Sequence, residues 1–114
     1  MAMRFVIIRA DDAITHVAIL GRLDIHGVQT IQDQFVIQTT VRRKATLVDV
    51  SQVTFIASLG MGMLVNAAKG LQRQGAKMVL LGPSTLVRHA LESAGIHQVI
   101  PIANEESAAL ELLR

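Results

Sequence analysis

One stretch of the sequence decides the fold: residues 47–64, LVDVSQVTFIASLGMGML. It begins as an apolar, β-branched run, which predicts a buried strand, and ends as an apolar-periodic run, which predicts a helix. Ser58 stands at the passage from strand to helix. A serine at this place can cap the helix, because its hydroxyl accepts a hydrogen bond from a free N–H of the first turn. The same N–H groups favour an anion, so the hydroxyl is alternatively a candidate to carry a phosphate.

The sequence on either side of this stretch predicts an alternation of strands and helices. A β-hairpin is predicted over residues 4–9 and 14–20, followed by an amphipathic helix over residues 28–41. A buried strand over residues 46–50 then leads into the helix that begins at Ser58 and ends near Gly75.

The C-terminal part repeats the same alternation. A strand over residues 77–81 is followed by a helix from Ser84 to Gly95, a strand over residues 98–102 and a last helix capped by Asn104. We expect the order ββαβαβαβα, which is an α/β fold with a mixed, mostly parallel sheet. The residues predicted to form the inward stripe of the helix after Ser84 are Leu86, Val87, Ala90, Leu91 and Ala94.

Composition and charge exclude several classes of protein. The chain has 114 residues, of which 51% are hydrophobic and 18% charged, and this predicts one domain over residues 1–114 with a substantial core. The net charge is +2, and with no Trp, no Tyr and three Phe the chain lacks the stacking surface of single-strand nucleic-acid binders. There is no Cys for a disulfide, and no apolar run approaches the ~20 residues of a membrane span. We therefore expect a cytoplasmic protein that neither binds nucleic acid nor inserts into a membrane.

Patterns for catalytic or cofactor chemistry are incomplete. Gly60-Met61-Gly62 follows a strand as in a dinucleotide-binding loop, but Val65 replaces the third glycine and no acidic residue stands about 20 residues further on. Both glycines are instead interpreted as positions where the helix packs closely on the sheet. No Gly-x-Ser-x-Gly motif is present. The four histidines, at positions 16, 26, 89 and 97, do not have the short spacing of metal ligands. The sequence therefore predicts no enzyme, no cofactor and no metal site.

Four segments, in order along the chain, resemble the STAS domain of bacterial anti-sigma factor antagonists. Residues 49–60 resemble the family signature, and Gly21-Arg22-Leu23-Asp24 resembles the segment before the first helix. Residues 69–80 are similar to the family's helix–Gly–strand passage, and residues 88–96 to its penultimate helix with a Gly-Ile end. The resemblance implies a mixed sheet with helices largely on one side.

The resemblance also implies a function. Members of the family bind an anti-sigma factor that is often a serine kinase, and this kinase phosphorylates the Ser or Thr that follows an Asp in the signature. By position this hydroxyl is Ser58, and Ala57 stands where the family usually has Asp. A phosphate there would bring negative charge into a partner surface packed over Leu59 and Met61, and would release that partner.

Residues 21–27 follow the second predicted strand, and residues 57–64 follow the third. We expect these two loops to lie on one edge, because the carboxyl ends of parallel strands gather there. Asp24 is alternatively a residue that bonds the N–H groups of its own turn. Two other functions stay open: an unmodified STAS scaffold or subunit of a larger complex, such as a stressosome or a lipid-transport assembly, and small-ligand or nucleotide binding on the same edge. With Ser58 as the phosphorylation site, the residues predicted to bind the anti-sigma factor are Gly21, Leu23, Asp24, Ile25, His26, Ala57, Ser58, Leu59, Gly60 and Met61.

Overall fold

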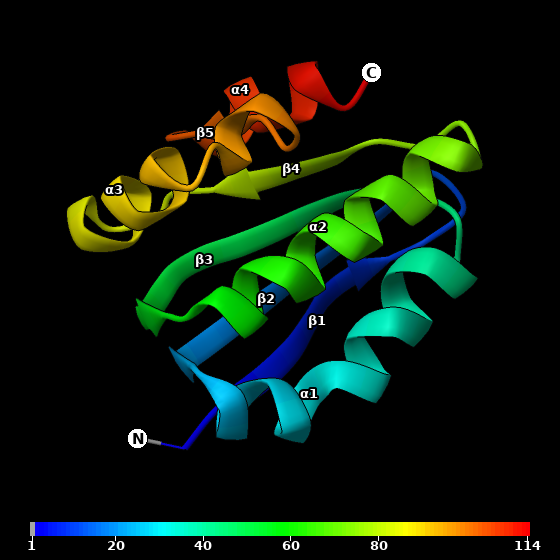
Figure 1. Ribbon diagram of the computed structural model, residues 1–114. Helices are drawn as coiled ribbons and strands as arrows, with labels where there is room; N and C mark the ends of the chain where they lie inside the picture. Colours follow the sequence, from blue (N-terminus) through cyan, green and yellow to red (C-terminus); the bar gives the residue numbers. More distant parts are fainter. Residues whose placement is uncertain (1) are drawn as a thin grey trace.

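A computed structural model describes residues 2–114, and its centre is one five-stranded sheet (Figure 1). Strand β1 runs antiparallel to β2, and the pairs β2–β3, β3–β4 and β4–β5 are parallel. The predicted α/β fold and element order are confirmed. The strands, which lie side by side in sequence order, are β1 (Arg4–Ala10), β2 (Ile14–Leu23), β3 (Ala45–Ile56), β4 (Met78–Leu81) and β5 (Ile102–Ala103).

Helices cover the two faces of the sheet unequally. The helices are α1 (Ile25–Val36), α2 (Ser58–Arg73), α3 (Thr85–Ser93) and α4 (Glu106–Leu112). A π-helical turn, Ile37–Val41, continues α1, and a 3-10 turn, Ile96–Gln98, follows α3. Helices α1, α2 and α3 contribute to the main core on one face, whereas α4 packs on the opposite face. No helix in the described part of the chain is both long and apolar enough to cross a bilayer.

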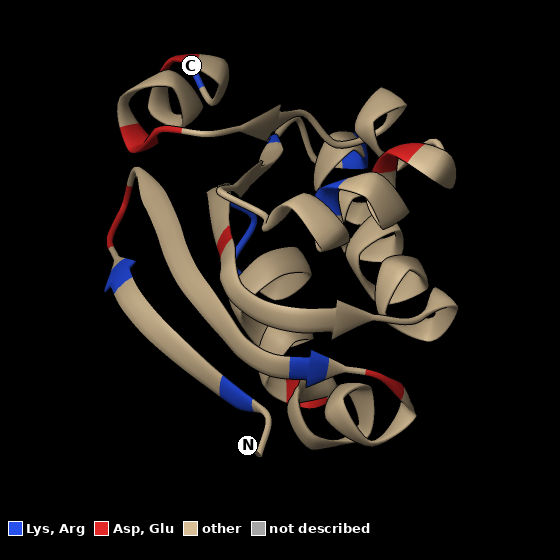
Figure 2. Ribbon diagram, turned by 90° about the vertical axis from the view of Figure 1, so that its left-hand side faces the viewer, with Lys and Arg blue, Asp and Glu red and all other residues tan. Residues whose placement is uncertain are grey.

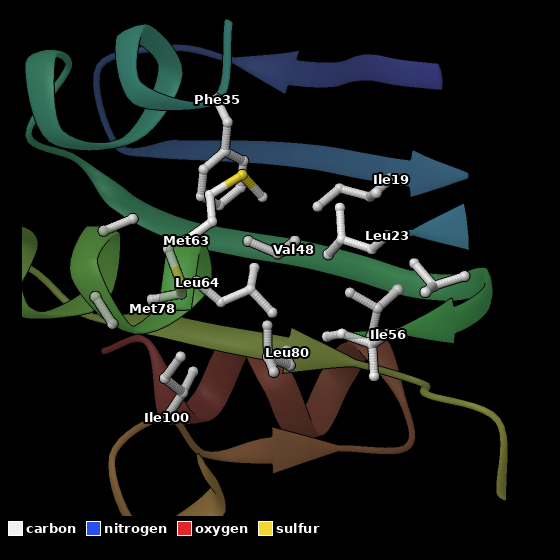
Figure 3. Packing of buried hydrophobic residues seen from close by; sticks show 14 of the residues in the cluster. Ile19, Leu23, Phe35, Val48, Ile56, Met63, Leu64, Met78, Leu80 and Ile100 are labelled. Atoms are coloured by element: carbon white, nitrogen blue, oxygen red, sulfur yellow. The ribbon is translucent and has the colours of Figure 1, made fainter. Parts of the chain in front are cut away.

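The main core lies between the sheet and α1 to α3 (Figure 3). Phe35 of α1 meets Phe5 of β1 edge to face, with ring centroids 6.1 Å apart. Leu64 of α2 and Leu80 of β4 are fully buried in the same cluster. A smaller cluster under α4 includes Leu47, Val79 and Ala109 on the other face. Strand β3 therefore has apolar residues on both faces, which is why its first half reads as a continuous apolar run.

Strands β2 and β3 are longer than the sequence predicted. Residues 51–56 pair only with β2, and the pairing of β3 with β4 ends at Asp49 opposite Leu81. The last part of β3 therefore projects beyond β4 as a two-stranded ribbon with β2. Helix α1 begins at Ile25, three residues before the predicted start, because Asp24 caps it.

Two predictions for the C-terminal part are wrong. The strand predicted over residues 98–102 is a 3-10 turn followed by the two-residue strand β5. Asn104 does not cap α4, because the N-cap of this helix is Glu105. The Asn104 side-chain oxygen instead accepts a hydrogen bond from the Arg88 guanidinium. Ser84 does cap α3, because its hydroxyl accepts the Val87 N–H at 3.3 Å.

Candidate functional site

The two predicted loops meet where β2 and β3 end. Leu23, the last residue of β2, is in register with Ile56, the last residue of β3. One step further, the Ala57 N–H donates a hydrogen bond of 3.0 Å to the Leu23 carbonyl. The structure thus brings Gly21–His26 and Ala57–Met61, which hold all ten predicted site residues, to one edge of the sheet.

The backbones of α2 and β2 approach each other closely at this junction. A Cβ added to Gly60 would lie 2.7 Å from both the Leu23 carbonyl oxygen and the Leu23 Cγ. The interpretation of Gly60 as a packing glycine is therefore confirmed. The same interpretation is wrong for Gly62, because a Cβ there would meet nothing within 4 Å. In α1, Gly27 has the equivalent role, since its Cβ would lie 2.2 Å from the Arg22 carbonyl oxygen.

Asp24 organises the first loop. Its Oδ1 accepts the Gly27 N–H at 2.9 Å, and its Oδ2 lies 3.3 Å from the Arg22 Nε. The Gly27 N–H is the main cause that holds the pKa of Asp24 below its usual value, and the Arg22 guanidinium adds to the effect. The Arg22 side chain also stacks on Phe55, with its Cζ 4.3 Å from the ring centroid. Asp24 therefore bonds its own turn, as the alternative interpretation predicted.

Ser58 is not the helix cap that the sequence suggested. The N-cap of α2 is Ala57, which is extended (φ −100°, ψ 170°) and offers no side-chain acceptor. Ser58 is the first helical residue and is exposed. Among the hydrogen bonds formed within residues 2–114, none involves the Ser58 hydroxyl. The hydroxyl is therefore available to solvent or to a partner.

Four large apolar side chains are exposed around the junction. Ile25 is 55% exposed, Leu59 49%, Phe55 37% and Leu86 66%. Leu86 was predicted to face inward and does not; the same correction applies to Ala94, also exposed. Phe55 and Leu86, which the sequence did not place in the site, line a hollow of about 220 Å³ with Ile56, Val87 and Ala90.

We call this surface the loop edge: residues 21–27, residues 55–61 and Leu86. It lies on the side of the molecule that faces the viewer in Figure 2, and its charged residues are one cation, Arg22, and one anion, Asp24. His26 is exposed on it, and Met61 is half-buried against the core. Exposed apolar side chains on a surface that holds few charges are typical of the centre of protein–protein interfaces.

Possible metal ligands are scattered over the described part of the chain. Residues 2–114 bring no group of three or more His, Cys, Asp or Glu side chains together as metal ligands. His16 is buried in β2, and its Nε2 has no hydrogen-bond partner within that range. His26, at the loop edge, lies apart from it in α1.

Comparison with known proteins identifies the class. The family model of the STAS domain matches residues 6–109, so the chain belongs to the STAS family. An anti-sigma-B factor antagonist of Listeria monocytogenes is 24% identical over 88 residues, which cover 77% of each chain.

Solved structures are similar to this chain in fold. An anti-sigma factor antagonist from Mycobacterium paratuberculosis has a TM-score of 0.87 at 17% identity, over 99% of this chain and 95% of that chain. The phosphorylated form of the Bacillus cell fate determinant SpoIIAA has a TM-score of 0.70 at 20% identity, over 97% and 100%. These similarities confirm the STAS-like fold.

Proposed function

We propose that this chain is an anti-sigma factor antagonist, which binds an anti-sigma factor through the loop edge in the cytoplasm. One observation carries the proposal: exposed apolar side chains surround a rigid, hydrogen-bonded junction of two loops that also presents an unbonded hydroxyl. The kinship with antagonists named in the comparisons supports the choice of partner. The proposed activity is binding, and no catalytic step is assigned to the chain.

The apolar side chains supply the binding energy in this proposal. Ile25 and Leu59 come from the two loops and Leu86 from the start of α3, so three separate segments contribute to one surface. Burying a large aliphatic side chain contributes about 1.5–3 kcal/mol relative to leaving it in water. The backbone bond from Ala57 to Leu23 and the close approach at Gly60 hold the loops in place before the partner arrives, which lowers the entropic cost of binding.

Phosphorylation of Ser58 is the proposed switch. A phosphate adds about −1.5 to −2 charges beside Leu59. The N-terminus of α2 tolerates such an anion and favours it by about 0.3–1 kcal/mol. A partner packed over Leu59 would have to desolvate the phosphate without pairing it, and this disfavours the complex. The domain itself need not refold.

The test begins with capture of the partner from the cells that make this chain, followed by binding measurements with the purified anti-sigma factor. We expect Leu59→Ser to weaken binding by fivefold or more, the usual loss at an important interface position. Ile37→Ser is the matched control, because Ile37 is exposed at the far end of α1. If both variants bind the anti-sigma factor as tightly as the unchanged chain does, the loop edge is not the binding surface.

The switch has its own measurement. Incubation with the anti-sigma factor and ATP is expected to add ~80 Da to the intact mass, and Ser58→Ala is expected to abolish the increment. The phosphorylated chain should then lose affinity for the anti-sigma factor. Full affinity of the phosphorylated chain would contradict the switch but not the binding site.

A second function is favoured by one specific observation. Ala57 stands where the resemblance implies Asp, so the carboxylate that usually precedes the phosphorylated residue is missing. The chain would then be an unmodified STAS subunit of a larger complex. Capture of transporter or large-complex subunits through the loop edge, with the mass of the chain unchanged, would support this second function instead.

A further inference from the structure

The end of the sheet opposite the loop edge is strongly basic. Four segments meet there: the β1–β2 turn, the passage from α1 to β3, the passage from α2 to β4, and the end of α4 (Figure 1). We call this surface the basic edge: residues 9–13, 41–44, 73–77 and 111–114. It holds seven Lys and Arg residues against three Asp and Glu, whereas the rest of the chain holds four against six. The positive charge of the protein is therefore concentrated at one end.

Hydrogen bonds show that these segments form one surface. Arg42 donates to the Asp11 carbonyl at 2.6 Å and to the Thr15 hydroxyl at 2.8 Å, which joins the first two segments. The Thr46 N–H donates to the Lys77 carbonyl at 2.8 Å. The Lys77 ammonium in turn donates to the Arg114 carbonyl at 2.6 Å. The edge is thus a connected surface rather than a set of unrelated charges.

Two of the three acidic side chains of this edge pair with cations of the same edge. Asp11 pairs with Arg9 at 2.6 Å, and Glu111 lies 3.7 Å from Arg114. By contrast, Arg43, Lys44 and Arg73 have no ion-pair partner among residues 2–114. The C-termini of α1 and α2 lie here too, and their dipoles offset part of this charge but not all of it.

Exposed aliphatic side chains stand among these cations. Val41 is 62% exposed directly before Arg42, and Leu112 is 44% exposed two residues before Arg114. The three phenylalanines, at positions 5, 35 and 55, all lie outside the edge, and the chain has no Trp or Tyr, so no Phe, Tyr or Trp ring is available there to stack on a base. Cations with interspersed aliphatic tips match the headgroup region of an anionic bilayer, where charge and a shallow apolar layer lie next to each other.

We propose that the basic edge docks this protein on an anionic lipid surface. The contact is peripheral: Arg43, Lys44 and Arg73 face the phosphates, and Val41 enters the boundary of the acyl layer without any helix crossing it. The loop edge lies at the other end of the parallel strands and points away from the bilayer. The protein could therefore hold a partner and a membrane at the same time. This inference does not depend on the function proposed above.

Vesicle sedimentation tests the proposal directly. The full chain is mixed with vesicles of phosphatidylcholine, or of phosphatidylcholine with phosphatidylglycerol, at low and at physiological salt. We expect binding only to the anionic vesicles, weakening as salt rises. Each cation near the surface contributes about 1 kcal/mol, so Arg73→Gln should lower the partition coefficient about fivefold. Arg43→Asn with Lys44→Gln should lower it further; Asn suits the left-handed backbone at Arg43 (φ 63°).

Matched controls separate this edge from general charge. Arg4→Gln removes one cation from an exposed residue at the start of β1, at the opposite end of the sheet, and should leave vesicle binding unchanged. Val41→Ser keeps the charge of the edge and should weaken binding to the anionic vesicles without changing binding to the competing polyanions. Duplex DNA and polyglutamate serve as competing polyanions in the same buffers. Binding to either as tight as to the vesicles, absence of vesicle binding, or an equal loss with Arg4→Gln would each overturn the proposal.

Discussion

Replacing Gly60 by alanine tests the junction on which the candidate site depends. The new Cβ would lie 2.7 Å from the Leu23 carbonyl oxygen, far inside a normal contact distance. That oxygen is a backbone atom and already accepts the Ala57 N–H at 3.0 Å. It cannot turn away as a flexible side chain would, so the start of α2 or the end of β2 has to move.

The magnitude follows from two opposing effects. Alanine in place of glycine within a helix stabilises it by about 1 kcal/mol. Overpacking against a fixed neighbour destabilises by about 1–3 kcal/mol. Gly60→Ala should therefore lower the free energy of unfolding by up to about 2 kcal/mol. Gly62→Ala lies in the same helix with nothing within 4 Å of its Cβ, so only the stabilising effect applies there.

Urea denaturation of the two variants beside the unchanged chain is the assay. We expect the Gly60→Ala midpoint to lie below that of the unchanged chain and the Gly62→Ala midpoint above it. The free energies of unfolding of the two variants should differ by about 1–3 kcal/mol. In thermal denaturation, a difference of 1 kcal/mol corresponds to about 4 °C for a chain of this size. Equal stability of the two variants would refute the close approach of α2 to β2.

Four further outcomes are expected. Leu64→Ala should lower the free energy of unfolding by about 2–5 kcal/mol in urea, because the side chain is fully buried. Ala57→Asp should raise it by about 1 kcal/mol in the same assay, since Asp is a good N-cap. Leu86→Ser should change stability by less than about 0.5 kcal/mol yet weaken anti-sigma factor binding in calorimetry. Arg9 is the main cause that lowers the Asp11 pKa from 3.8 to about 2. The stability contributed by this carboxylate is therefore present above pH 3.8 and lost as the pH falls towards 2. Urea denaturation across that pH range should show a smaller loss of unfolding free energy for Asp11→Asn than for the unchanged chain.

The order of elements could be predicted because apolar periodicity and glycine stops agree along the chain. Gly75 and Gly95 adopt left-handed conformations (φ +81° and +76°) after α2 and α3, as expected for helix ends. The extent of β3 could not be predicted. Its second half, SQVTFI, begins with two polar residues and ends with two apolar ones, so no strict alternation marks it as a strand, and only pairing with β2 shows that it continues to Ile56.

The position of the loops could be predicted, but their surface could not. Parallel strands place Leu23 and Ala57 at the same edge by topology alone. Whether Leu86 points to the core or to solvent depends on how α3 is rotated against β3. Its neighbour Val87 is buried while Leu86 is 66% exposed, although both are equally apolar in the sequence. Nothing local distinguishes the two residues, so the Phe55–Leu86 hollow emerges only from the packed structure.

The one-residue shift of the helix start changes what Ser58 can do. A serine at the N-cap would offer its hydroxyl to an N–H of the first turn, so its side chain would already be engaged by the helix. Here Ala57 occupies the N-cap and Ser58 the first helical position, so a phosphate on Ser58 breaks no bond of α2. The helix dipole stabilises that phosphate at the same time. An Asp at position 57 would add a capping carboxylate beside the phosphate, and the two negative charges would repel each other. Ala57 therefore leaves α2 without a side-chain cap and avoids this repulsion, but it also lacks the carboxylate that the resemblance implies before the phosphorylated residue, so Ala57→Asp tests both the stability of α2 and the proposed phosphorylation of Ser58.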